Sequence, residues 1–267
     1  MTTPAINVVR TPIEPFGCLI ESQEPDMDLR VIPASTLAEW ARAARVLVLR
    51  GFSLFSTEEL AEYCKRFGEL LEWDFGVVLE LKGEKNPKNY LFDSGEVPYH
   101  WDGAFAGTVP SFMFFQCLEA EGENLGGETT FCDTTWVLAD ATPAEIATWE
   151  QVSITYSTEK IAHYGGQFTA PMLSRHPVTG EQTIRYAEPV PETFLNPVYL
   201  EIEGIPEGST QEFINGMHER LHHPSFKYAH EWRKGDILIS DNHANVHGRN
   251  PFKSDGLRRH LQRVEII

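Results

Sequence analysis

Two short histidine-containing segments, far apart in the chain, constrain it more than any other feature. The first is His100-Trp101-Asp102, and the second contains His243 and His247. Residues i and i+2 of an extended segment point to the same side, so His100 and Asp102 can reach one metal ion while Trp101 points elsewhere. A His-x-Asp pair with one distant histidine is the pattern of the 2-His-1-carboxylate facial triad, which occupies one face of Fe(II) and leaves the other open. The pattern predicts a metal centre that activates oxygen.

Spacing alone does not decide which residue is the third ligand of this centre. His243 and His247 are close together in the chain, and either can complete the triad. A lone His-x-Asp sequence also occurs by chance in many proteins, so the interpretation depends on the motifs around it.

The C-terminal segment carries two arginines on one predicted face. In a strand over residues 257–266, period-2 alternation places Arg259, Leu261 and Arg263 on the same side. Buried guanidinium groups are very costly without anions, so these arginines either face water or meet something negative. A dicarboxylate cosubstrate would supply that charge.

Four motifs follow one another along the chain. They are H-x-D at His100, G-G-x-T ending at Thr129, D-N-x-x-x-x-H-G-R ending at Arg249, and R-x-x-x-R beginning at Arg259. In order and spacing they resemble the taurine dioxygenase-like family of Fe(II)/2-oxoglutarate oxygenases. The resemblance covers most of the chain, and it implies Fe(II), 2-oxoglutarate as cosubstrate and O2.

The resemblance also implies which residues bind the metal. His100 and Asp102 would be ligands, together with His247, because the third ligand of the family directly precedes Gly-Arg. His243 would then lie near the site or on the surface. A glycine or alanine in place of Asp102 would open a chloride site, so the carboxylate argues against a halogenase.

The same resemblance implies the cosubstrate contacts. Thr129 with Arg259 would hold the distal carboxylate of 2-oxoglutarate. Arg263 matches a position that meets the acidic group of the substrate or braces the cosubstrate site.

Less generic stretches carry a closer resemblance. Residues 46–52, 72–81, 98–103 and 228–233 are similar to the oxygenases of isonitrile biosynthesis of the paerucumarin and rhabduscin type. This resemblance implies a small-molecule aromatic isonitrile acid as substrate, a 2-isocyano-3-arylpropanoate made from tyrosine or tryptophan. The implied reaction is oxidative decarboxylation and desaturation to a vinyl isonitrile.

Two other functions remain in competition with this one. A hydroxylase of another small carboxylic or amino acid would use the same cofactors and leave an oxygen atom in its product. A non-catalytic metal-binding barrel would form no succinate in response to substrate, and the complete triad with Arg259 argues against it.

Aromatic and basic residues near these motifs are candidates for substrate contacts. Aromatic rings beside the His-x-Asp pair can stack on an aryl group, although core packing is an equal alternative. Basic side chains in the middle section, residues 151–224, can pair with a substrate carboxylate, although exposure to water is the commoner outcome. The candidates are Trp101, Phe105, Phe75, Lys160, His163, Tyr164 and Arg185.

Charge and composition narrow the class of partner. The formal net charge of −17 disfavours nucleic acid and anionic membrane surfaces, which repel such a chain. No stretch approaches the roughly 20 apolar residues of a membrane span. At 267 residues and 42% hydrophobic content, the chain can bury the core of one domain over residues 1–267. Monomer and homodimer both remain open.

The cysteines and the N-terminus favour the cytoplasm. Cys18, Cys64, Cys117 and Cys132 are scattered without a C-x-x-C pair, and the N-terminus lacks a basic start and an apolar core. We expect the four cysteines to be small buried hydrophobes in a reducing compartment.

Hydrophobic periodicity and capping residues predict a mainly β chain with flanking helices. Ser35 is expected to cap a helix through Ala44, and Ser56 with Glu59 to form a capping box for a helix ending near Gly68. Further helices are expected from Thr142 and over residues 209–222. Strands are expected over residues 46–50, 76–81, 111–118, 128–132, 151–156, 183–187, 236–239 and 257–266. This distribution suits a double-stranded β-helix, the jelly roll of the cupin kind, with loops of residues 151–224 covering the site.

Overall fold

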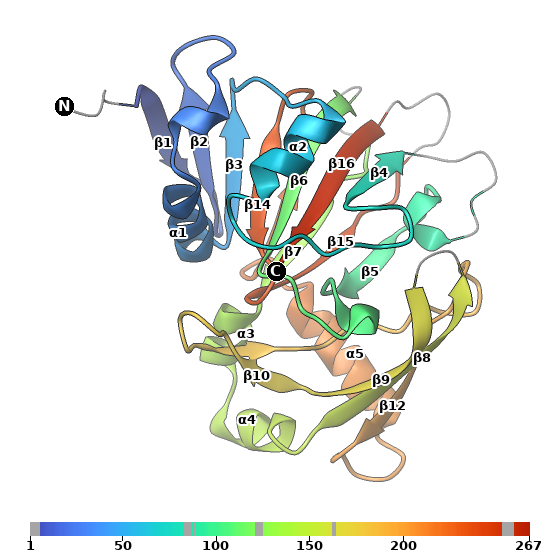
Figure 1. Ribbon diagram of the computed structural model, residues 1–267. Helices are drawn as coiled ribbons and strands as arrows, with labels where there is room; N and C mark the ends of the chain where they lie inside the picture. The colour runs from blue at the N-terminus through green and yellow to red at the C-terminus, as the bar shows by residue number, and fades with distance from the viewer. Residues whose placement is uncertain (1–5, 83–86, 88, 121–124, 162–163, 253–258) are drawn as a thin grey trace.

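The computed structural model of the chain describes residues 6–82, 87, 89–120, 125–161, 164–252 and 259–267. Two sheets, one of seven strands and one of four, face each other, and helices and a smaller sheet surround them (Figure 1). This is the predicted jelly roll, mainly β with flanking helices.

The larger sheet forms one wall of the jelly roll. All its neighbouring strands are antiparallel except β2 and β3, which are parallel. A bulge between His260 and Leu261 interrupts its pairing near one edge. In spatial order its strands are β1 (Val8–Pro12), β2 (Cys18–Ser22), β3 (Val46–Arg50), β14 (Ile237–Asp241), β6 (Phe112–Ala120), β16 (Arg259–Ile266) and β4 (Val78–Lys82).

The smaller wall is antiparallel and carries the histidine motifs. Its two inner strands, β7 and β15, are buried along their whole length. In spatial order the strands are β13 (Lys227–His230), β7 (Thr129–Asp133), β15 (Asn245–Arg249) and β5 (Val97–His100).

The middle section of the chain contains more strands than predicted, together with the predicted helix, and a loop between β11 and β12 lines a cavity beside the site. β8 is longer than predicted and pairs with β9 and β12 in a separate three-stranded sheet. The bounds are β8 (Ser153–Ile161), β9 (Tyr164–Pro171), β10 (Leu173–Arg175), β11 (Gln182–Ile184), β12 (Tyr199–Glu203) and α5 (Thr210–Leu221).

Apolar side chains fill the space on both sides of the larger sheet. Between the two walls, Phe115 and Leu261 pack with Phe131 and Trp232. On the outer face, β-strand residues pack against α1 and α2, and the four cysteines are free and buried as expected. The remaining helices are α1 (Ala34–Ala44), α2 (Thr57–Cys64), α3 (Thr134–Asp140), α4 (Pro143–Trp149) and the short η1 (Leu29–Val31), η2 (Tyr90–Phe92) and η3 (Ala104–Ala106). No helix among the described residues is both long and apolar enough to cross a membrane.

Two of the predicted helix caps are correct and one is wrong. Ser56 and Thr142 form complete capping boxes with Glu59 and Glu145. Ser35 does not cap α1, because the helix begins one residue earlier and Pro33 occupies the N-cap position without a side-chain hydrogen bond. α2 ends at Cys64, before the predicted end.

Thr142→Ala is expected to lower the free energy of unfolding by about 1 kcal/mol, because it removes the oxygen that accepts from the Glu145 amide. Urea denaturation measures the change. Thr148→Ala is the matched control, since this exposed threonine lies inside the same helix and alanine is the better helix former there. Equal losses in both variants would contradict the capping role.

Candidate active site

Two strands of the smaller wall bring the predicted metal ligands together. β5 ends at His100, β15 contains His247, and the two residues are direct partners across the ladder. Asp102 follows in a turn. Each of these three side chains offers a ligand atom, and the three atoms lie within 4.8 Å of one another. The residues chosen from the sequence therefore form one cluster.

A glycine permits the close approach of these two strands. A Cβ atom at Gly248 would come within 2.4 Å of the Val97 carbonyl oxygen. Any side chain there would push β15 away from β5 and separate His247 from His100. This explains why glycine follows the histidine in the H-G-R motif.

The side chains are oriented so that their free atoms converge. His100 Nδ1 lies 2.9 Å from the Pro98 carbonyl oxygen, which can only accept, so Nδ1 carries the proton and Nε2 keeps its lone pair. That Nε2 lies 3.7 Å from Asp102 Oδ1, and His247 Nε2 lies 3.9 Å from Asp102 Oδ2. Two imidazoles and a carboxylate around one point are donors that suit iron.

The backbone of Asp102 is fixed by a residue from the second histidine motif. Asn242 accepts from the Asp102 amide at 3.0 Å and donates to the Asp102 carbonyl oxygen at 3.1 Å. The reciprocal pair joins the turn after β5 to the turn before β15. Sequence reasoning missed this role, although Asn242 belongs to the D-N-x-x-x-x-H-G-R motif.

Burial keeps the two imidazoles neutral and the carboxylate charged. Desolvation lowers the pKa of His100 and, together with repulsion by His100, lowers that of His247 further. Burial opposes the charge of Asp102, but Arg263 and the two histidines outweigh it and lower the pKa of that carboxyl. Neutral imidazoles and a charged carboxylate are the forms that bind a divalent metal.

His243 lies outside this cluster. Its Nδ1 faces Arg185 Nη2 at 2.6 Å, and its backbone amide donates to Asp241. Burial, followed by the charge of Arg185, lowers the pKa of His243 to about 4. The structure thus pairs His247, and not His243, with His100 and Asp102.

A small cavity with basic side chains opens on one side of the cluster. Its empty space between the two walls of the jelly roll is about 400 Å³, part of which is open to solvent, and we call it the basic cavity. Among its lining residues are His100, His247, Thr129, Arg249, Arg259 and Arg263. Despite the bulge in β16, Arg259 and Arg263 therefore reach the same space, as the alternation predicted.

Arg259 and Thr129 lie together in the basic cavity. Arg259 Nε donates to the Gly127 carbonyl oxygen at 3.1 Å, and its Nη2 lies 3.4 Å from Thr129 Oγ1. Trp232 Nε1 also donates to Thr129 Oγ1, at 2.9 Å. The Thr129 hydroxyl oxygen accepts from both donors with its two lone pairs. Its one proton can then be donated to a ligand in the cavity. Trp232 therefore positions Thr129, a role that was not predicted, although the residue lies in the stretch 228–233.

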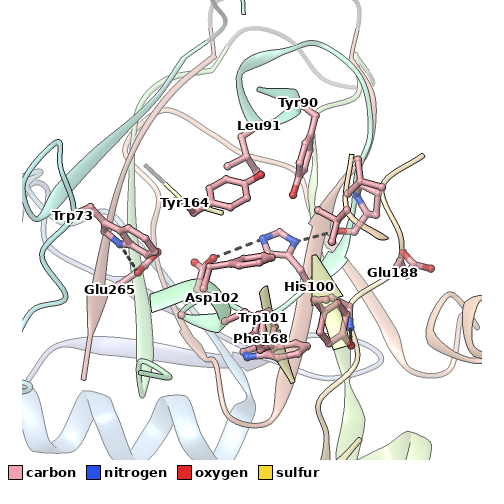
Figure 2. Close-up of a pocket in the computed structure, with 18 of the residues that line it drawn as sticks. Trp73, Tyr90, Leu91, His100, Trp101, Asp102, Tyr164, Phe168, Glu188 and Glu265 are labelled. Atoms are coloured by element: carbon pink, nitrogen blue, oxygen red, sulfur yellow. Dashed lines mark hydrogen bonds and ion pairs between the residues drawn. The ribbon is translucent and has the colours of Figure 1, made fainter. Parts of the chain in front are cut away.

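A larger cavity, with several aromatic rings in its wall, also adjoins the cluster. Its empty space is about 740 Å³, part of which is open to solvent, and we call it the aromatic cavity. Figure 2 shows the rings of Tyr90, Tyr164 and Phe168 around His100 and Asp102. η2, β5, β9 and the segment after β11 contribute to its wall.

The predicted substrate residues separate into three groups. Trp101, Phe105 and Tyr164 line the aromatic cavity, and Trp101 also packs edge-to-face on Tyr156. Arg185 lines neither cavity, because its buried guanidinium is bound to the Asn242 carbonyl oxygen and to His243. Phe75 stacks on Trp73 and is also absent from both linings. The side chain of Lys160 and the whole of His163 lie outside the described residues.

Arg263 lies where the two cavities meet. Its Nη1 is 2.7 Å from Asp102 Oδ2, close but without the alignment of a hydrogen bond, and its Nη2 is 2.5 Å from Glu265 Oε1. Trp73 Nε1 donates to the other oxygen of Glu265 at 2.9 Å. Burial and repulsion by Asp102 raise the pKa of Glu265 to about 7. Glu265 and Trp73 also line the aromatic cavity, and neither role was predicted, although Trp73 lies in the stretch 72–81 that resembles the isonitrile oxygenases.

Comparison with known proteins places this site in a family. The model of the "Taurine catabolism dioxygenase TauD, TfdA family" matches residues 12–264. The chain belongs to this family. As a taurine dioxygenase family member it is an Fe(II)/2-oxoglutarate-dependent oxygenase that consumes O2, and the donor set of its three clustered side chains fits iron.

Individual relatives are similar over nearly the whole chain. The 3-((Z)-2-isocyanoethenyl)-1H-indole synthase of Fischerella ambigua is 48% identical over 257 residues, covering 96% of this chain and 94% of the relative. The tyrosine isonitrile desaturase of Pseudomonas aeruginosa is 38% identical, covering 94% of this chain and 87% of the relative.

Solved structures agree with these relatives. A crystal structure of PvcB from Pseudomonas aeruginosa superimposes with a TM-score of 0.82 at 34% identity, over 97% of this chain and 91% of that one. Another structure of PvcB, described as an Fe, alpha-ketoglutarate dependent oxygenase from an isonitrile synthetic pathway, gives a TM-score of 0.81 over 100% and 94% of the two chains.

Proposed function

We propose that this enzyme converts an aromatic 2-isocyano-3-arylpropanoate into an aryl vinyl isonitrile, with loss of the substrate carboxylate as CO2. In this proposal His100, Asp102 and His247 ligate the iron. Thr129 and Arg259 hold the distal carboxylate of 2-oxoglutarate.

The observation that best supports the proposal is that two different cavities meet beside the cluster of His100, Asp102 and His247. His100 and Arg263 belong to the walls of both the basic and the aromatic cavity. The basic cavity offers a buried arginine and a hydroxyl to a small dianion. The aromatic cavity offers the rings of Trp101, Phe105 and Phe168 to an aryl acid, and apolar and aromatic side chains of this kind usually line ligand pockets. Cosubstrate and substrate can therefore approach the same metal from different sides.

The residues of the chain bind the substrate, orient it and exclude water from the site. When bound, iron and 2-oxoglutarate use O2 to supply an oxidant that removes hydrogen from a C–H bond, while 2-oxoglutarate becomes succinate and CO2. The rings of Trp101, Phe105 and Phe168 form an apolar wall that can hold an aryl group and keep water from it. Arg263 places a positive charge beside the cluster, where it can meet the carboxylate of the substrate.

The substrate class follows from the relatives together with this wall. Both curated relatives quoted above carry isonitrile chemistry in their names, one on an indole and one on tyrosine. The reaction removes a benzylic hydrogen and the neighbouring carboxylate, and the electron pair that remains forms the carbon–carbon double bond. O2 accepts two electrons from 2-oxoglutarate and two from the substrate, giving succinate and water.

Given Fe(II), O2, 2-oxoglutarate and the isonitrile of tyrosine or tryptophan, the enzyme is expected to form succinate and a product lighter by CO2 and two hydrogens. Mass spectrometry measures both. Deuterium at the benzylic carbon is expected to slow the reaction where hydrogen removal limits the rate. The free amino acids, which lack the isocyano group, serve as matched controls and are expected to react poorly.

Two outcomes would contradict this proposal in different ways. A product heavier by one oxygen atom would establish the alternative, a hydroxylase that uses the same cofactors. Succinate formation that does not respond to any isocyano acid would remove isonitriles as the substrate class.

The cytoplasm is the compartment we propose, since four free buried cysteines and a ferrous cofactor both suit reducing conditions.

A further inference from the structure

A second group of metal-ligating side chains lies behind the aromatic cavity. His218 lies in the last turn of α5, and His222 is the C-cap residue, whose amide donates to the His218 carbonyl oxygen at 3.0 Å. Glu188 approaches them from the segment after β11. Each of the three offers a ligand atom within 4.8 Å of the other two. His218 Nδ1 lies 2.6 Å from Glu188 Oε1, and His222 Nε2 lies 3.0 Å from the same oxygen.

The spacing on the helix suits joint coordination. Residues i and i+4 lie on one face of a helix, so His218 and His222 present their rings side by side, with centroids 4.1 Å apart. Imidazole and carboxylate are ligands of zinc, and sites with three protein ligands leave a fourth position to water. The same donor types form the cluster in the active site, but here two of them come from one helix.

The carboxylate is held in place independently of the histidines. The Tyr99 backbone amide donates to Glu188 Oε2 at 2.8 Å, and the Tyr99 ring packs against His222 at 4.5 Å. Such support from outside the ligand set orients metal-binding side chains and is a usual feature of metal sites. Metal-binding side chains that are not held in this way lose more conformational freedom when the metal binds.

The exposure of His218 and the negative charge of Glu188 also favour the binding of a cation. Glu188 is 7% exposed, so its negative charge is largely removed from water, whereas His218 is 57% exposed and opens the cluster to solvent. His218 Nδ1 and His222 Nε2 both face the carboxylate of Glu188. A ring nitrogen without a proton offers a lone pair to a metal ion, and these two nitrogens already lie close enough to the carboxylate for one ion to contact all three groups.

We infer that Glu188, His218 and His222 form a second metal site, of the zinc class and distinct from the iron centre. Its ion would join α5 to the wall of the aromatic cavity, since Glu188 also lines that cavity (Figure 2). Tyr99 connects the site to β5, one residue before His100. The site therefore fastens two elements that shape the substrate pocket.

Zn²⁺ binding to tag-free, metal-stripped protein tests this inference. Equilibrium dialysis with elemental analysis is expected to find two equivalents on the wild type. His218→Ala and His247→Ala are each expected to keep one equivalent, and the double variant none. The equivalent that His218→Ala retains shows that this variant is folded. Loss of one of three direct ligands is expected to weaken the second site by about a hundredfold or more, since loss of an outer partner alone costs about ten- to a hundredfold.

His223→Ala is the matched control. His223 is exposed, adjoins His222 in the chain and is not part of the cluster, so this variant is expected to bind two equivalents. Co²⁺ in place of Zn²⁺ gives an independent readout, because its visible absorption reports nitrogen and oxygen ligands. A wild type that binds one equivalent, or a second equivalent that survives both His218→Ala and His222→Ala, would overturn the inference. Neither result depends on the substrate proposed for the iron centre.

Discussion

Replacing His247 by alanine is expected to abolish turnover and release iron from the protein. The cluster uses three side chains, and the two that remain in this variant, His100 and Asp102, come from one short segment of the chain. His100→Ala and Asp102→Ala are expected to have the same effect. Asp102→Ala also leaves Arg263 without the carboxylate that lies 2.7 Å from it, so some loss of stability is expected there as well. Iron content after dialysis and succinate formation measure these effects.

His243→Ala is the control for the whole series. It removes a partly buried imidazole from the same segment as His247, but one that pairs with Arg185 and does not face the cluster. This variant is expected to keep its iron. Iron that stays in His247→Ala and leaves His243→Ala would show that the wrong histidine was chosen.

Local signals in the sequence predicted the starts of two helices, α2 and α4. The capping boxes at Ser56 and Thr142 are correct because a few neighbouring residues determine them. The cap at Ser35 is wrong because the chain enters α1 through Pro33, and no side chain is needed to start the helix there. Capping signals therefore located helices reliably but did not fix every first residue.

The strands that carry the active site were harder to predict than the ligands on them. β5 is four residues long and contains Pro98, and β15 contains mainly polar or small residues. All residues of β15 are buried, so it lacks the apolar alternation by which half-buried strands are recognised. The ligands were found from motif order, while their strands became visible only in the sheet, where β15 pairs with β7 on one side and with β5 on the other.

The roles of residues that act through distant partners could not be predicted from the sequence, even where the residues lie in recognised stretches. Trp73 reaches Glu265 from another part of the chain, and Trp232 follows β13 and reaches Thr129 at the start of the neighbouring β7. Arg185 was predicted as a candidate for substrate contact, and the structure places it outside both cavities, bound to the Asn242 carbonyl oxygen and to His243. In each case the tertiary fold, and not the residue type, decides which groups meet.

Replacing Arg259 by alanine is expected to raise the 2-oxoglutarate KM roughly ten- to a hundredfold, the loss of a charge-assisted contact of about 1.5 to 3 kcal/mol. Burial, followed by repulsion from Arg249, lowers the pKa of Arg259, so a bound dianion relieves a real cost. No carboxylate among the described residues forms an ion pair with it. Arg259→Lys keeps the charge but loses the planar, two-pronged geometry, so a loss is expected here too.

Two further variants distinguish the loss of a direct contact with 2-oxoglutarate from a general disturbance of the fold. Thr129→Val removes one hydroxyl and is expected to give a smaller rise in the same KM, of roughly two- to tenfold. Arg185→Lys makes the same substitution at another buried arginine, outside both cavities, and is expected to leave the KM unchanged. Calorimetry with a non-reactive 2-oxoglutarate analogue checks that binding itself changes. Two results would contradict this assignment: an unchanged 2-oxoglutarate KM in Arg259→Ala, or an equal rise of that KM in Arg185→Lys. Either result would mean that the charge of Arg259 does not bind 2-oxoglutarate, and the cosubstrate site would then have to lie outside the basic cavity.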